Sequence, residues 1–289
     1  MDKPIGISSF GVVAQLKKYL KLPKTHKIGH GGTLDPLASG VLPIALGEAT
    51  KTVDYVMNSD KVYEFTIAFG SKTDTADAEG NIVQTTDFTP TESDLINILP
   101  KFIGEISQKP PAYSAIKING ARAYALARAG EAVEIPSRKI KIYSLELKNF
   151  DSINKKATLI AKVSKGTYIR TLAEDIAENL GSLGHIAYLR RTEICIHKEK
   201  LLLSLNSIYN EEYTVENYLI SIEDMLKDIL AYSLNLKQAT EVRNGNLSSL
   251  LGCPKGIFKS LYQGKILALM ENKDGKVSFL RVFNHNQLI

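Results

Sequence analysis

Long hydrophobic runs are missing from this chain. No stretch of ~18 consecutive apolar residues occurs, so no membrane-spanning helix is expected. The first six residues lack the basic-then-apolar pattern of a signal peptide. Only two cysteines, Cys195 and Cys253, are present, which excludes a disulfide scaffold, and with five scattered histidines they form no zinc-ligand spacing. Together these absences predict a cytoplasmic protein with no membrane partner and no bound metal.

The composition itself is that of an ordinary globular protein. The chain has 289 residues, 44% of them hydrophobic and 23% charged, which fits one large domain or a large domain with a small one. The net charge is +5, but residues 101–200 hold 18 Lys and Arg against 10 Asp and Glu, or +8. This basic middle favours a polyanionic partner such as nucleic acid. A lysine-rich face of a protein that binds no nucleic acid is the alternative.

The hydrophobic pattern predicts a mixture of helices and strands. The clearest strand is residues 61–69, where Tyr63, Phe65 and Ile67 share one face. A capping box is predicted at residues 89–92, with Pro90 at the first helical position. The other expected elements are a helix from Ser8 or Ser9 to Leu20, a shaped loop over 24–47, an apolar helical stripe at Leu95, Ile98, Leu99 and Phe102, strands over 140–150, 157–163 and 185–196, a helix from 168 to 180, an irregular linker over 205–217, a short helix over 222–230, and a small all-β module from about 233.

The segment over residues 29–43 holds the most unusual side chain. Asp35 lies between Leu34 and Pro36 in a largely apolar, glycine-rich stretch. A carboxylate there is costly to bury unless another group pairs with it. An Asp-Pro turn, in which the side chain bonds its own backbone, is the alternative. A phosphate-binding loop is disfavoured, because neither a G-x-G-x-x-G nor a Walker-type lysine pattern is present.

Several motifs in a fixed order resemble those of one known family. The segment 29–43 resembles the catalytic motif of the bacterial TruB family of tRNA pseudouridine-55 synthases. Seven further segments resemble the motifs of that family in the same order: 2–9 (DKPIGISS), 47–51 (GEATK), 61–64 (KVYE), 73–77 (TDTAD), 110–117 (PPAYSAIK), 166–170 (GTYIR) and 188–191 (YLRR). The resemblance covers about residues 2–200. The family usually has an apolar strand before the first motif, so either the start of the chain was assigned late or this edge strand is truncated here.

The resemblance implies the fold and the domain organisation. It predicts an α+β protein whose catalytic domain, residues 1–215, is built on a mixed, largely antiparallel sheet. An insertion over about 117–141 is expected to close over RNA. Residues 233–289 resemble, more loosely, a PUA-like RNA-binding module. The protein is expected to be a monomer.

The resemblance also implies a reaction and a catalytic residue. It predicts isomerisation of uridine-55 to pseudouridine in the T-arm loop of tRNA, with the base flipped out, without guide RNA and without any cofactor. By motif position the catalytic residue is Asp35, and Arg170 is its expected partner. A neighbouring guanidinium favours the charged form of a carboxylate, which keeps it reactive. From spacing alone, an ordinary surface ion pair of Arg170 with Glu174, four residues along the same helix, is the favoured interpretation.

Further residues are implied as contacts to the RNA. Tyr63, Tyr168 and Leu189 are expected to pack around the flipped base, and His30 to help bind the flipped nucleotide. Lys117, Arg122 and Arg128 are expected to contact the RNA backbone. Without the resemblance, the favoured interpretation of Tyr63 is core packing, and that of His30 is a hydrogen-bonded histidine in a glycine loop. The basic stretch is then interpreted as a solvated helix face.

Two other functions compete with the isomerase. The first is a non-catalytic tRNA-binding protein or chaperone that uses the C-terminal module. The second is a guide-RNA-dependent relative of the archaeal and eukaryotic type. The presence of Asp35, Tyr63 and Arg170 together disfavours the first, because a pure binder does not need a buried carboxylate. The small C-terminal module and the bacterial spelling of the motifs disfavour the second.

Overall fold

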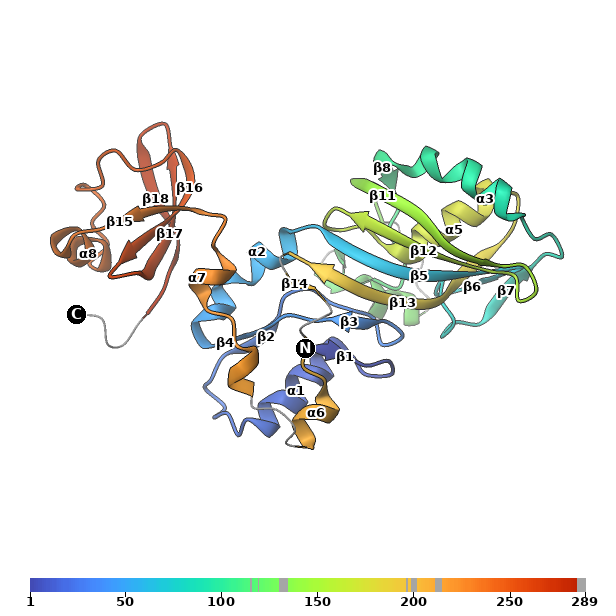
Figure 1. The fold of residues 1–289 in the computed structure, drawn as a ribbon, viewed down its shortest axis with the longest axis horizontal. Coiled ribbons are helices and arrows are strands. Elements are labelled where there is room, and N and C mark those ends of the chain that lie inside the picture. Colours follow the sequence, from blue (N-terminus) through green and yellow to red (C-terminus); the bar gives the residue numbers. More distant parts are fainter. Residues whose placement is uncertain are drawn as a thin grey trace.

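The largest feature of the fold is a mixed eight-stranded sheet. The computed structural model describes residues 1–114, 116–118, 120–129, 135–195, 197–198, 202–210 and 215–284. The sheet has the order β1-β3-β13-β5-β12-β11-β8, and β14 pairs with β13 (Figure 1). Its strands are β1 (Asp2–Lys3), β3 (Ser39–Val41), β5 (Lys61–Phe69), β8 (Gly104–Gln108), β11 (Arg138–Asp151), β12 (Lys156–Val163), β13 (Gly184–Ile194) and β14 (His197–Lys198). All neighbours are antiparallel except β3 and β13, so the predicted mixed, largely antiparallel sheet is confirmed.

Strand β5 lies in the middle of this sheet and has the predicted bounds. Its side chains alternate between buried and partly buried, as the period of two required. Phe65 and Ile67 are fully buried and belong to one apolar cluster with Leu95 and Leu172. Those two residues come from α3 (Glu92–Ile98) and α5 (Ile169–Asn179), which therefore pack on the same core (Figure 1). The predicted α5 and its end before Gly181 are confirmed, as are β11 and β12.

The predicted start of α3 was wrong by two residues. The N-cap is Thr91, not Thr89, and Pro90 lies before the cap instead of at the first helical position. The Thr91 hydroxyl accepts a hydrogen bond from the Asp94 amide, and the Asp94 carboxylate accepts one from the Thr91 amide. Aspartate three residues after threonine forms the same reciprocal pair as the expected glutamate. The predicted apolar stripe is nevertheless buried, and it continues through η2 (Leu99–Phe102).

The glycine-rich segment 24–47 is more regular than predicted. It contains two further strands besides β3, namely β2 (Ile28–His30) and β4 (Ile44–Leu46), which pair with each other. Before it lies α1 (Ser9–Tyr19), capped by Ser8 as expected. The remaining elements of the first 200 residues are η1 (Gly47–Thr52), α2 (Val53–Asn58), β6 (Ser71–Thr73), β7 (Ile82–Thr85), β9 (Lys117–Ile118), β10 (Ala121–Arg122) and α4 (Ala123–Arg128).

Gly40 explains how the short strand β3 fits beside β13. The two strands are parallel, and Gly40 lies opposite Arg191. Gly40 has φ +101°, and a Cβ at this position would lie 2.2 Å from the Arg191 carbonyl oxygen. Only glycine allows so close an approach in this backbone conformation. The residues just before β3 carry Asp35, so this pairing sets where the Asp35 loop begins and ends.

Three predictions for the second half of the chain were wrong. The expected irregular linker contains α6 (Leu205–Tyr209) and η4 (Val215–Tyr218), and the expected helix over 222–230 is only α7 (Ile222–Met225). The C-terminal part is not all-β, because α8 (Leu236–Arg243) follows its first strand. The predicted end of one strand at Ile196 lies outside the described residues.

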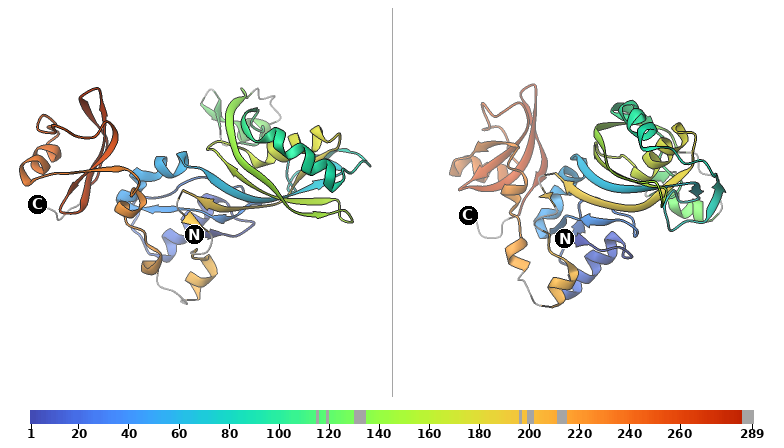
Figure 2. Two further views of the ribbon diagram at one scale, coloured as in Figure 1. Left: turned by 45° about the horizontal axis from the view of Figure 1, so that its top comes forward. Right: turned by 45° about the vertical axis from the view of Figure 1, so that its right-hand side comes forward.

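A four-stranded sheet forms the C-terminal part. Its strands are β15 (Leu230–Ser233), β16 (Gly256–Tyr262), β17 (Lys265–Lys273) and β18 (Lys276–Val282), in that order. Figure 2 shows this part at one end of the molecule, apart from α3 and α5. Arg281 of β18 forms an ion pair of 2.7 Å with Asp54 of α2, and an apolar cluster joins Tyr55, Leu226 and Phe283. None of the helices in the described ranges has the length and apolar character needed to span a bilayer.

Candidate active site

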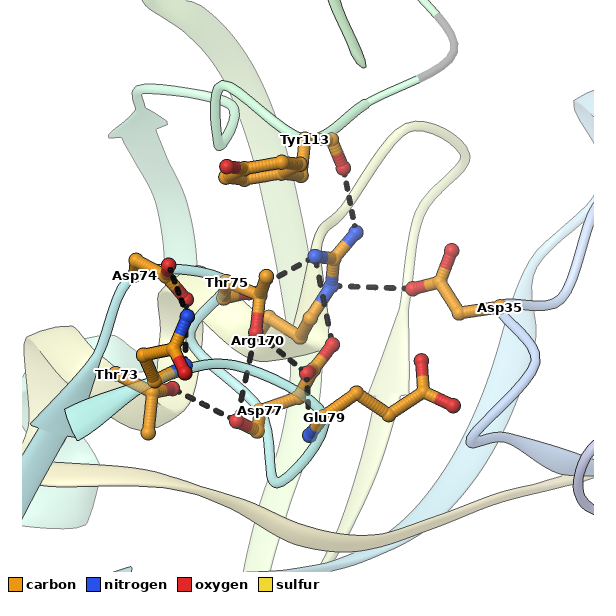
Figure 3. Close-up of polar contacts among 9 residues, drawn as sticks. Asp35, Thr73, Asp74, Thr75, Asp77, Glu79, Tyr113 and Arg170 are labelled. Atoms are coloured by element: carbon orange, nitrogen blue, oxygen red, sulfur yellow. Dashed lines mark hydrogen bonds and ion pairs between the residues drawn. The ribbon is translucent and has the colours of Figure 1, made fainter. Parts of the chain in front are cut away.

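Arg170, near the start of α5, lies at the centre of a buried polar network. Only 4% of the residue is exposed. Its Nε lies 3.0 Å from Asp35 Oδ2, its Nη1 donates to the Thr75 carbonyl at 2.9 Å, and its Nη2 donates to the Tyr113 carbonyl at 2.8 Å (Figure 3). These partners come from three separate segments of the chain. A planar guanidinium held at three nitrogens cannot rotate, so it fixes the direction from which it meets Asp35.

The Asp35 carboxylate is anchored at one oxygen and open at the other. Its side chain is 37% exposed, although its partner is buried. Oδ2 faces Arg170 and the second oxygen points away from it (Figure 3). Among the described residues, no other hydrogen bond or ion pair is made by this carboxylate. Glu174, the alternative partner of Arg170 along the helix, instead lies 3.6 Å from Lys72.

Buried cations and a serine hold the loop that carries Asp35. The Lys3 ammonium donates to the Pro36 carbonyl at 3.2 Å, and the Arg191 Nη2 donates to the Gly32 carbonyl at 2.9 Å. The Ser9 hydroxyl donates to the Leu34 carbonyl and accepts from the Leu34 amide. Burial lowers the pKa of Lys3 to about 8, against the opposing attraction of Asp35 and Glu79. Lys3 and Arg191 are thus used to fix backbone carbonyls on both sides of Asp35.

A second carboxylate, Asp77, supports Arg170 from below the network. Its side chain is 4% exposed, and its Oδ2 lies 3.6 Å from the Arg170 Nη1. Its Oδ1 accepts from the Thr75 hydroxyl at 2.6 Å and from the Glu79 amide at 3.1 Å. Sequence reasoning quoted the motif over residues 73–77 but gave Asp77 no function. The sequence signal for Asp77 was that it is a second acid within this motif. No spacing rule connects Asp77 to Arg170, which lies 93 positions later in the chain.

Glu79 adds a third acid to the same opening. Partial desolvation, together with the negative charges of Asp77 and Asp35, raises the pKa of the Glu79 carboxyl above its ordinary value. Lys3 and Arg170 act in the opposite direction. Three acids thus face two cations here, which keeps this part of the site close to neutral overall.

Tyr63 and Leu189 lie on neighbouring strands close to the Asp35 loop. Tyr63 on β5 is 8% exposed and Leu189 on β13 is 5% exposed. Both belong to the apolar cluster that contains Leu34, the residue before Asp35. Tyr168, the N-cap residue of α5, is partly buried and directly precedes the turn of helix that carries Arg170. The sheet and α5 therefore bring an apolar surface and the Asp35–Arg170 pair to the same place.

His30 lies on β2 and is not bonded to the Arg170 network. Its buried Nδ1 has no hydrogen-bond partner among the described residues. Burial and the nearby Arg191 lower the pKa of His30, which favours the neutral ring. His30 lines an open hollow of about 520 Å³ with Lys17, Lys24 and Lys27, and a second hollow of about 540 Å³ runs along α1. Neither hollow is lined by Asp35, whose accessibility follows from its exposed side chain.

The three basic residues expected to contact the RNA backbone lie on a hairpin and a short helix. Lys117 and Arg122 pair across β9 and β10, and Arg128 ends α4. Their side chains lie outside the described part of the structure, so their predicted contacts stay predictions. Part of the expected insertion, residues 130–134, also lies outside the described residues.

The arrangement suits chemistry by a carboxylate. Among the described residues, no group of three or more His, Cys, Asp or Glu side chains is placed to hold a metal ion. An anchored carboxylate with one accessible oxygen can attack an electron-poor carbon or accept a proton. The adjacent apolar side chains offer a surface on which a flat, uncharged ring can pack.

Comparison with known proteins identifies a family with these features. Residues 17–169 match the TruB family pseudouridylate synthase (N terminal domain), and residues 170–231 match the tRNA pseudouridylate synthase B C-terminal domain. The tRNA pseudouridine synthase B of Rickettsia bellii is 44% identical over 289 residues, covering 99% of this chain and 97% of that protein. The protein of the same name from Novosphingobium aromaticivorans is also 44% identical, over 98% of this chain and 96% of the relative.

Solved structures share the fold over almost the whole chain. A chain of a Cbf5-Nop10-Gar1 complex superimposes with a TM-score of 0.69 at 25% identity, covering 99% of this chain and 82% of that chain. A chain of an H/ACA RNP bound to a substrate RNA containing 2′-deoxyuridine gives a TM-score of 0.71 at 23% identity, covering 99% and 84%. At that identity the second likeness speaks for the fold alone.

Proposed function

This chain belongs to the TruB family of pseudouridylate synthases, and we propose that it converts uridine-55 in the T-arm loop of tRNA into pseudouridine without a guide RNA. The near-full-length relatives named as tRNA pseudouridine synthase B support tRNA as the substrate. The observation that carries the proposal is the ion pair between buried Arg170 and half-exposed Asp35. It leaves one carboxylate oxygen of Asp35 open to a ligand while the guanidinium holds the other in place.

The reaction moves a bond within the nucleoside. The bond from the ribose C1′ to N1 of uracil breaks, a bond from C1′ to C5 forms, the C5 proton leaves, and N1 gains a proton. Asp35 is the catalytic residue in this proposal, through its unanchored oxygen. Arg170 holds it against reorientation, and Asp77 in turn fixes Arg170. Preorganised charges of this kind lower the barrier because they need no rearrangement during the reaction.

The base must leave its stack to reach Asp35. We propose that the flipped uracil packs against Tyr63, Tyr168 and Leu189, and that His30 contacts the flipped nucleotide. Stacking on an aromatic ring is worth ~1–3 kcal/mol per base, enough to offset much of the cost of unstacking in a loop. Lys117, Arg122 and Arg128 would hold the RNA backbone. Residues 1–215 then act as the catalytic domain and residues 233–289 as the RNA-binding module.

The two competing functions differ in what they require of the site. A tRNA-binding chaperone needs the basic surfaces but not the Asp35–Arg170 pair. A guide-dependent enzyme could use the same pair, but the near-full-length relatives named tRNA pseudouridine synthase B, at 44% identity, favour the tRNA enzyme.

The test uses a synthetic T-arm stem-loop with tritium at C5 of its uridines. The purified full chain should release one tritium per stem-loop into water, with no guide RNA added, because the C5 hydrogen is lost only when C5 becomes the attachment point. A stem-loop with cytidine in place of the target uridine is the control and should release none. Binding of the stem-loop without release would support the chaperone, and release only with added guide RNA would support the guide-dependent enzyme.

A further inference from the structure

Arg138, at the beginning of β11, makes contacts to which the proposed reaction assigns no role. Its guanidinium carbon lies 4.8 Å from the centre of the Tyr168 ring, so the cation rests on the ring face. Its Nη2 donates to the Gly166 carbonyl. Its Nε is buried and donates to no acceptor among the described residues. A buried donor without an acceptor costs free energy, so the ring and the Gly166 carbonyl must hold the guanidinium there.

Gln108 holds the main chain of the same tyrosine. It is 1% exposed and lies opposite Arg138 in the register of β8 and β11. Its amide oxygen accepts from the Tyr168 amide at 2.8 Å, and its amide nitrogen donates to the Tyr168 carbonyl at 3.1 Å. Two neighbouring residues of the sheet therefore fix Tyr168: Gln108 its backbone, and Arg138 its ring.

The backbone before Tyr168 is shaped to accept Arg138. Gly166 has φ +81°, and a Cβ there would lie 3.3 Å from the Arg138 guanidinium carbon. A side chain at this position would require the guanidinium to shift by a few tenths of an ångström. The close approach of Arg138 to this turn thus depends on both residues of the contact, the arginine at 138 and the glycine at 166.

Residues 166–170 also hold the first end of the expected insertion, near Tyr113. The Tyr113 carbonyl, before the insertion, accepts from Arg170, while Arg138, near its end, contacts Gly166 and Tyr168. Both ends of the chain between Tyr113 and Arg138 are therefore tied to residues 166–170. A shift of that chain on RNA binding would be felt first at Tyr168 and Arg170.

We propose that Arg138 is a positioning residue for the reaction, which fixes the ring of Tyr168 against the flipped base and ties the end of the insertion to Gly166 and Tyr168. This proposal rests on the proposed function, because the proposed function gives Tyr168 a flipped base to contact. Arg138 then affects the rate on bound RNA more than it affects RNA affinity. Lysine cannot replace it, because an ammonium lacks the flat face and the fork of donors.

The test compares Arg138→Ala and Arg138→Lys with wild type on a saturating T-arm stem-loop. Arg138→Ala should lower the single-turnover rate about 2- to 30-fold, the range of a cation–π contact, with less than about a twofold change in RNA dissociation constant. Arg138→Lys should not restore the rate. Lys139→Ala is the matched control, since Lys139 is the next residue, has an 82% exposed side chain and pairs with Glu105.

A double-mutant cycle shows whether Arg138 acts through Tyr168. Tyr168→Leu combined with Arg138→Ala should slow the reaction no more than the slower single variant. Additive losses would overturn the proposal. A phosphate contact at Arg138 would also overturn the proposal. In that case Arg138→Lys would restore the rate, and Arg138→Ala would weaken RNA binding. The slope of log affinity against log salt concentration would then fall by about one.

Wild-type turnover separates this proposal from the one on which it rests. If wild-type protein released no tritium from the stem-loop, the proposed function would fail. If wild type were active and Arg138→Ala equally fast, only the role of Arg138 would fail. Thermal melting of each variant shows whether it is folded, and Arg138→Lys, which keeps the buried charge, carries the test if Arg138→Ala unfolds.

Discussion

At the scale of single residues, the site depends on how one guanidinium distributes its donors. Arg170 contacts two carboxylates and two carbonyls, so its planar fork matters as much as its charge. Lysine has the charge without the geometry. The proposed division between Arg170 as holder and Asp35 as reactant rests on their exposures, 5% and 37% for the side chains.

Arg170→Lys should reduce turnover of the stem-loop by about 100-fold or more. Losing two charge-assisted hydrogen bonds, each worth ~1.5–3 kcal/mol, is enough for that effect. Tritium release under single-turnover conditions measures it. Lys101→Arg, at an exposed position of η2, is the control and should be as active as wild type. Full activity of Arg170→Lys would mean that charge alone orients Asp35.

At the scale of elements, local patterns predicted those parts whose burial has a simple period. Both ends of strand β5 were predicted correctly, because neighbouring elements bury one face of the strand and its residues therefore alternate. Helix α5 was predicted because Leu172 and Ile176 lie on one apolar stripe. The missed elements are short. Helix α8 carries its own sequence signal, a capping box formed by Asn235 and Gln238, but has only eight residues. Strands of three residues, such as β2 and β4, are set by pairing and not by propensity.

The pairing of β3 with β13 should not tolerate a side chain at position 40. Gly40→Ala should lower the free energy of unfolding by about 3 kcal/mol or more, because its Cβ would collide with the Arg191 carbonyl oxygen and its φ is strained. Urea unfolding measures this. Gly104→Ala is the control, since Gly104 also has a positive φ of +111° but nothing within 4 Å of its Cβ position. Equal losses in both variants would show that strain alone matters.

Helix α5 contains an acid whose burial makes stability depend on pH. Burial raises the pKa of Asp175 from 3.8 to about 6, aided by Glu178 and opposed by Lys72. The folded chain thus binds the extra proton more readily than the unfolded chain, so this contribution to stability is present at about pH 4 and is lost as pH rises through 6.

Asp175→Asn should therefore stabilise the protein at pH 7.5 and have no effect near pH 4. Allowing for solvent screening of a partly buried group, the gain is about 1 kcal/mol, or ~2–4 °C in melting temperature. Asp87→Asn, at an exposed acid, should show no such pH-dependent gain. A melting temperature of Asp175→Asn that matched wild type at both pH values would contradict the assignment.

At the scale of the whole molecule, contacts distant in sequence build both the site and the link to the C-terminal sheet. Asp35, Thr75, Tyr113 and Arg170 meet although 135 positions separate the first from the last. The sequence identified Asp35 and Arg170 as site residues only through resemblance, since spacing alone favoured an Asp-Pro turn at Asp35 and Glu174 as the partner of Arg170. It gave no function to Asp77, Lys3 or Arg138. Asp77 pairs with Arg170, which lies 93 positions later, Lys3 bonds backbone carbonyls and Arg138 packs on a ring, and no sequence pattern specifies such partners.

Phe283 should hold the C-terminal sheet against the rest of the protein. It is 4% exposed in the cluster with Tyr55 and Leu226, so Phe283→Ala should cost about 3 kcal/mol. The loss should appear as earlier melting of the C-terminal part, followed by calorimetry, while turnover of the short stem-loop stays within about threefold of wild type. Loss of turnover in a variant that remains folded would show that this contact also shapes the Asp35 site.

The central claim is that the carboxylate of Asp35 performs the reaction while Arg170 and the loop hold it in place. The most direct measurement is the single-turnover tritium release of Asp35→Asn on a saturating T-arm stem-loop, with RNA affinity measured in parallel. The account predicts no detectable release with affinity within about threefold of wild type, because the amide keeps the shape and loses only the charge. Release at the wild-type rate from Asp35→Asn would contradict it.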